Sequence, residues 1–157
     1  MQQQKTSHWL IAFRVIFTAA LLACILFIFR NSMQTGEVSS ARSQAVTTLV
    51  NGFLGKFGLG PLSEHIIRKL AHFSEYALLG VLIGLAYRLQ PWSWMKGKVA
   101  LLPFFIIPVL DENLQRFSSG RSCELRDMLI DSAGMAAGMF LAIVLLGIIG
   151  HQKKQED

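Results

Sequence analysis

Histidine, basic and acidic side chains gather in three short segments that separate long apolar stretches. In the first, His72, Glu75 and Tyr76 lie four, seven and eight residues after Arg68, so they share one face of a helix. Lys69 lies on the flank of that face. A histidine beside a carboxylate can transfer protons, and the two cations can bind an anion.

The second and third segments are mainly acidic. Asp111 and Gln115 are four residues apart, with Glu112 beside Asp111. Asp127 and Asp131 are also four residues apart, so they share a helix face. Carboxylates at these spacings can pair with cations or bind polar groups of a ligand.

These segments supply one set of candidate site residues. The candidates for ligand binding are Arg68, Lys69, His72, Glu75, Tyr76, Asp111, Glu112, Gln115, Arg121, Asp127 and Asp131. Within this set, the candidates for catalytic roles are His72, Glu75, Asp111 and Glu112.

The elements that must position these residues are membrane helices. Apolar residues make up 52% of the 157-residue chain and charged residues 16%, against about 25% charged in a soluble domain. The pattern predicts an all-α integral membrane protein, a single domain over 1–157. We expect a four-helix bundle with spans at about 9–29, 67–88, 99–117 and 128–149.

The middle two spans determine where the charges lie. The apolar runs 77–87 and 99–110 are only about half the length that a membrane helix needs. A re-entrant hairpin would bring Arg88, Lys96 and Lys98 near the bilayer centre, at about 2.5–3.5 kcal/mol each. Full spans are favoured, and they must extend through His72 and Asp111. Both extensions reach the same membrane face, so we predict one charged end of the bundle, here called the polar mouth.

The connection between the first two spans has helical periodicity of its own. Its apolar residues are Val46, Leu49, Val50, Phe53, Leu54 and Phe57, with polar residues between them. This predicts an amphipathic segment that lies on the bilayer surface or packs against the bundle.

Two glycine pairs predict a helix contact. Gly80 and Gly84 lie in the second span, and Gly134 and Gly138 in the fourth. Small residues four apart permit close backbone approach in lipid. The two spans are therefore expected to touch, although the same faces could equally form a homodimer.

The charged segments also carry a family resemblance. Arg68-Lys69-Leu70-Ala71-His72-Phe73-Ser74-Glu75-Tyr76, Asp111-Glu112-Asn113-Leu114-Gln115-Arg116-Phe117 with Gly120-Arg121, and the segment 127–134 resemble the VanZ-like family over roughly residues 5–150. That family comprises small multi-span membrane proteins associated with teicoplanin (glycopeptide) resistance. The resemblance implies a cell-envelope role. Its characteristic positions are Lys69, His72, Glu75, Tyr76, Asp111, Glu112, Gln115, Arg121, Asp127 and Asp131.

Three functions fit these residues. The polar mouth could recognise a lipid head group or a lipid-linked cell-wall precursor, with Arg68, Lys69 and Arg121 on phosphate. It could instead be an enzyme site in which His72 and carboxylates perform acid–base or metal-assisted chemistry on an envelope lipid. It could also be a purely structural ion-pair cluster, with Lys69 or Arg68 on Glu75 and Arg121 on Asp111 or Asp127.

The expected partners follow from the same pattern. Membrane lipid is expected, and nucleic acid is not, because no basic stripe with interleaved aromatic residues is present. One histidine among carboxylates is also typical of ion-pair networks, so neither a metal nor a cofactor is predicted. The short loop with Arg88, Lys96 and Lys98 is dense in cations and lacks acids. The positive-inside rule then predicts cytoplasmic termini and an external polar mouth in the cell membrane.

Overall fold

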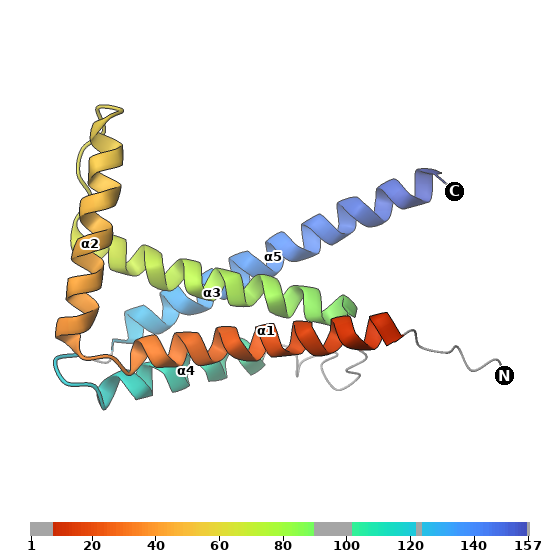
Figure 1. The fold of residues 1–157 in the computed structure, drawn as a ribbon, viewed down its shortest axis with the longest axis horizontal. Helices are drawn as coiled ribbons and strands as arrows, with labels where there is room; N and C mark the ends of the chain where they lie inside the picture. Colours follow the sequence, from red (N-terminus) through yellow and green to blue (C-terminus); the bar gives the residue numbers. More distant parts are fainter. Residues whose placement is uncertain (1–7, 90–101, 122–123, 157) are drawn as a thin grey trace.

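The chain folds as an all-helical bundle in which one helix crosses the end (Figure 1). The computed structural model describes residues 8–89, 102–121 and 124–156. The helices are α1 (His8–Ser32), α2 (Gly36–Gly55), α3 (Glu64–Leu89), α4 (Leu102–Arg116) and α5 (Leu125–Glu156).

Three of these helices have the length and composition of membrane spans. The qualifying segments are His8–Ser32, Glu64–Tyr87 and Leu125–Ile148. They coincide with the predicted spans 9–29, 67–88 and 128–149. Large apolar side chains on α1 face outward, with Trp9 85% and Ile16 69% exposed, as expected of a surface that contacts lipid. The protein is therefore a multi-pass membrane protein.

The fourth predicted span, 99–117, corresponds to α4. Its 15 described residues extend about 22 Å, short of the roughly 30 Å hydrocarbon core. Residues 99–101 lie outside the described part of the chain. Both α3 and α5 begin at the end of the bundle that α2 crosses, and α4 ends there (Figure 1). The direction of α4 is therefore the one that a fourth crossing requires. The four-span count remains a prediction.

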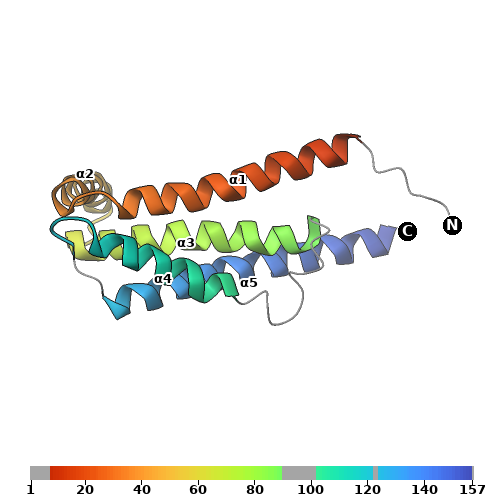
Figure 2. The ribbon, with the colours of Figure 1, turned by 90° about the horizontal axis from the view of Figure 1, so that it is seen from below.

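The segment between the first two spans is the helix α2, which lies crosswise to the bundle axis (Figures 1 and 2). Thr35 caps its start by accepting a hydrogen bond from the backbone of Val38. None of its residues is buried, and Leu49 and Phe53 are exposed. This position at the bundle end fits the predicted helix on the bilayer surface.

The pair α3 and α5 forms the most extensive helix contact, and the predicted glycine pairs lie within it. A Cβ at Gly138 would overlap the carbonyl oxygen of Ala77, and one at Gly80 would overlap that of Met135. The predicted contact between these spans is confirmed. Whether the chain also forms a homodimer remains a prediction.

Candidate functional site

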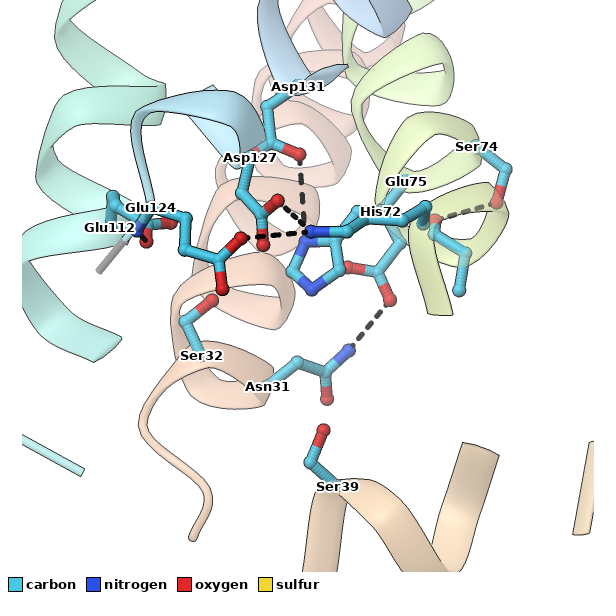
Figure 3. A network of polar contacts seen from close by, with 12 residues as sticks. Asn31, Ser32, Ser39, His72, Ser74, Glu75, Glu112, Glu124, Asp127 and Asp131 are labelled. Carbon is cyan, nitrogen blue, oxygen red and sulfur yellow. Dashed lines mark hydrogen bonds and ion pairs between the residues drawn. The ribbon is translucent and has the colours of Figure 1, made fainter. Parts of the chain in front are cut away.

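The polar mouth lies where four helix ends meet (Figure 2). These are the last turn of α1, the first half of α3, the last turns of α4 and the first turns of α5. The close view shows side chains from these helices facing one another (Figure 3). The turn 117–121 closes the group, with the Ser118 hydroxyl donating to the Ser32 carbonyl at 3.2 Å.

The deepest layer of the mouth is acidic. Asp111 of α4 and Asp131 of α5 are both completely buried. His72 of α3 places its Nδ1 3.6 Å from a carboxylate oxygen of Asp131. Tyr76, one turn further along α3, is also buried next to Asp111. Helical spacing on α3 aims both side chains at these acids.

A second layer ties α3, α4 and α5 together. Lys69 forms an ion pair with Asp127, and its Nζ lies 3.9 Å from a carboxylate oxygen of Glu124. Glu112 is fully buried and accepts a hydrogen bond from the backbone nitrogen of Glu124. Asp127 lies in the first turn of α5, and Glu112 of α4 contacts the backbone just before that turn, so both carboxylates lie at a helix start where the helix dipole favours negative charge. Gln115, one turn further along α4, is 4% exposed.

Arg121 holds the end of α1. Its guanidinium donates to the carbonyl oxygens of Asn31 at 3.3 Å and Ser32 at 2.9 Å, and to the Ser39 hydroxyl at 2.9 Å. The last carbonyls of a helix have no partner within the helix, and the helix dipole is negative there. A cation at this end therefore gains both hydrogen bonds and a favourable electrostatic interaction. Burial, together with the neighbouring Arg68 cation, lowers the pKa of the Arg121 guanidinium. Its ordinary pKa is so high that the group remains charged.

The ion pairs expected under the structural interpretation differ from those observed. Arg68 pairs with Glu64 at 2.7 Å, and Glu75 accepts a hydrogen bond from the Asn31 side chain at 3.0 Å. Lys69 turns to α5, so the expected pairing of Arg68 or Lys69 with Glu75 was wrong for the described side chains. The expected pairing of Arg121 with Asp111 or Asp127 was also wrong, because backbone carbonyls of α1 occupy that guanidinium.

Two of the cavities at the mouth contain His72 in their lining. The larger has a volume of about 210 Å³ and lies between α1, α2 and α3, with Arg42, Arg68 and Arg121 in its lining. The smaller, about 110 Å³, lies toward α5 and is lined by Lys69 and Asp127 among others. Arg68, His72 and Arg121 line both cavities. His72 therefore stands between the open space and the buried acids.

Several residues of this site were not among the candidates from the sequence. They are Asn31, Ser32, Ser39 and Arg42, which follow the first span. Their position offered a usable signal: the first span ends on the membrane face where the second begins. Polar residues directly after it must therefore lie near the polar mouth.

The arrangement has two chemical capabilities. The imidazole of His72, oriented by Asp131, can accept or donate a proton. His72, Asp111 and Asp131 also offer one nitrogen and two oxygen ligand atoms that lie within 4.8 Å of one another. Glu75 and Asp127, which belong to the wider acidic set from the sequence, are outside this group of three.

The fold and the mouth define a small multi-pass membrane protein whose charged residues converge at one end. Residues 17–146 match the VanZ/LLP1 family, and the chain belongs to that family. No curated protein and no solved structure gave a significant match.

Proposed function

We propose that the polar mouth binds the anionic phosphate of a lipid head group, either of a membrane lipid or of a lipid-linked cell-wall precursor. The observation that carries the proposal is the cavity lined by Arg42, Arg68 and Arg121, where Glu75 is the one carboxylate among the lining residues. Arginine binds phosphate through two parallel hydrogen bonds.

The state of the arginines supports an anionic ligand. The Nε of Arg68 is buried and has no hydrogen-bond partner among the described residues. Burial, and after it the nearby Arg68 cation, lowers the pKa of Arg121. An anion between the two cations would satisfy the Nε donor and relieve their repulsion.

The size and place of the cavity favour a head group. A volume of about 210 Å³ is below the range of about 300–1,000 Å³ typical of pockets that enclose a whole drug-sized ligand. The cavity borders α2, whose exposed Leu49 and Phe53 suit the boundary between head groups and acyl chains. The phosphate would enter the cavity while the acyl or polyprenyl chain stays in the bilayer.

The proposed cellular setting is the outer face of the cell membrane, with both termini in the cytoplasm. There the protein would alter how an envelope lipid or precursor is presented. A change in teicoplanin susceptibility would then be an indirect result of binding. Comparing susceptibility in cells that produce the native chain or the Arg42→Gln variant tests this link.

The direct test is lipid binding by purified protein. Fluorescent short-chain phosphatidylglycerol and a polyprenyl diphosphate should bind, and phosphatidylcholine should bind much more weakly. Arg42→Gln should reduce the affinity, whereas Arg116→Gln should not, because Arg116 is exposed and outside both linings. Equal binding of all three lipids, or equal loss in both variants, would contradict the proposal.

An enzymatic role is the second candidate, because His72 lines the cavity and pairs with the buried Asp131. A carboxylate-oriented imidazole can deprotonate a hydroxyl or a water molecule. Incubating the protein with labelled polyprenyl diphosphate or phosphatidylglycerol separates the two candidates. A new product that disappears in His72→Gln supports catalysis, and retention of unchanged lipid supports binding alone.

A further inference from the structure

We propose that His72, Asp111 and Asp131 bind one divalent transition-metal ion, of the class of Zn²⁺ or Mn²⁺, at the base of the polar mouth. This inference is based on the surroundings of Asp111 and Asp131 and does not depend on lipid binding.

The first observation is convergence. The three residues come from α3, α4 and α5, and each offers a ligand atom within 4.8 Å of the other two. Metal–ligand distances of about 2.0–2.2 Å keep the donor atoms of one ion within about 4.4 Å of one another, so these three atoms would need to approach by at most a few tenths of an ångström. Three protein ligands with a remaining open position are typical of catalytic zinc sites.

The second observation is that the buried carboxylate oxygens of Asp111 and Asp131 accept few hydrogen bonds. Asp111 and Asp131 are fully buried, and in the described part of the chain none of their four carboxylate oxygens accepts a hydrogen bond of good geometry, although the hydroxyls of Ser32 and of the buried Tyr76 lie close to Asp111. Buried polar atoms in proteins are nearly always satisfied, so unsatisfied oxygens that face one another point to a bound group.

The third observation is charge. Among the described residues, the side chain that pairs with these carboxylates is His72, whose Nδ1 lies 3.6 Å from Asp131 and which carries a charge only when protonated. Lys69 is directed to Asp127 and Glu124, and Arg121 to the end of α1. One imidazole cannot neutralise two buried carboxylates, whereas a divalent cation can.

The ligand types indicate the kind of ion. An imidazole nitrogen suits zinc and iron, and carboxylate oxygens suit manganese and magnesium. A mixed set of one nitrogen and two oxygens therefore favours Zn²⁺ or Mn²⁺ over Ca²⁺. His72 also lines both cavities, so the ion would lie at the inner boundary of the space that opens to the mouth.

The test uses the full-length protein, purified without chelator, stripped and reloaded with Zn²⁺ or Mn²⁺ alone. Elemental analysis should give one ion per chain, and pulsed electron paramagnetic resonance of the Mn²⁺ form should show coupling to one imidazole nitrogen. Asp111→Asn, Asp131→Asn and His72→Gln should each weaken binding at least about tenfold, because even residues that only support a ligand contribute that much. Glu37→Gln is the control, because Glu37 is an exposed acid that lines neither of these two cavities, and this variant should keep the ion.

Folding is monitored separately, so a failed variant does not decide the outcome. Native protein should gain thermal stability on adding Zn²⁺, and Asp131→Asn protein that elutes as a single species should not. If the two acids instead share a proton, no stoichiometric ion will bind to native protein. That result, or an ion retained equally by all three variants, overturns the proposal.

Discussion

The α3–α5 interface and the polar mouth share the helices α3 and α5, to which the mouth adds the ends of α1 and α4, but the two regions are built in opposite ways. Along the interface, Gly80, Gly134 and Gly138 bring backbones together, and the contacts leave no room for a side chain. At the mouth, Asp111 and Asp131 are just as buried, yet their oxygens accept no hydrogen bond of good geometry from the described residues. A region optimised for stability satisfies its groups, whereas a region with unsatisfied buried groups has the character of a binding site.

The largest loss of stability is expected from a substitution in the α3–α5 interface. Gly138→Val should destabilise the protein by at least about 3 kcal/mol, the upper range for overpacking, because its side chain would meet the backbone of Ala77. Detergent-solubilised protein should show a lower melting temperature or a loss of the single chromatographic peak. Gly147→Val on the same helix is the control, since a Cβ there meets nothing within 4 Å. Equal effects of both substitutions would refute the packing assignment.

The next effect concerns the ion pair that joins α3 to α5 at the mouth. Lys69→Met leaves Asp127 without its cation and should lower stability by about 1–3 kcal/mol, less than for a completely buried pair because both side chains remain 16% exposed. The charge-swapped double variant, Lys69→Asp with Asp127→Lys, should recover part of the loss. Thermal unfolding measures both. A stable Lys69→Met variant would show that this pair does not hold the helices together.

Asp111→Asn, in contrast, should leave the stability unchanged or increase it. The amide keeps the shape of the side chain and removes a buried charge that has no ion pair with another described residue, so the melting temperature of ion-free protein should stay the same or rise. If the acids serve only as structural pairs, this variant and His72→Ala will instead lose folded yield in parallel with any cellular effect. Melting temperature measured beside metal content distinguishes the two outcomes.

The smallest effect on folding is expected at the rim of the mouth. Arg42 is exposed, and its one observed side-chain bond, to Asn31, is 3.4 Å long, so Arg42→Gln should change stability by less than about 0.5 kcal/mol. The affinity of the Arg42→Gln protein for phosphatidylglycerol should nevertheless fall roughly threefold to tenfold. Binding of this lipid by the native protein should weaken as the salt concentration rises. A titration at two salt concentrations checks this. Salt-independent binding would mean that the head group does not interact with the arginines.

The sequence predicted the parts of the fold that depend on periodicity. Apolar runs located α1, α3 and α5, and the spacing of Val46 to Phe57 located the second half of α2, which begins ten residues earlier at Gly36. The half-length runs also predicted where His72 and Asp111 would lie, since a helix must cross the bilayer whatever its neighbours are. The glycine pairs predicted the α3–α5 contact because few residues other than glycine permit that approach.

The partners of individual side chains could not be predicted in the same way. Helical spacing assigns a residue to a face but does not fix how far one helix slides along another, and that offset selects Asp127 rather than Glu75 for Lys69. Arg121 contacts Ser32 only because the turn 117–121 folds back beneath α1, and a sequence pattern does not specify that path. The length of α4 could not be predicted either, because its apolar run ends at Asp111 and apolar periodicity does not indicate how far the helix continues.

Every proposal requires the helix ends of the mouth to share one membrane face, and side-specific cysteine labelling measures this directly. With Cys24 and Cys123 replaced by serine, single cysteines would be introduced as Glu37→Cys, Ser119→Cys and His8→Cys. We predict that a membrane-impermeant maleimide labels the first two variants in intact cells and the third only after permeabilisation. Labelling of Glu37→Cys and Ser119→Cys from opposite sides would contradict the account, and labelling of both only after permeabilisation would reverse the proposed orientation.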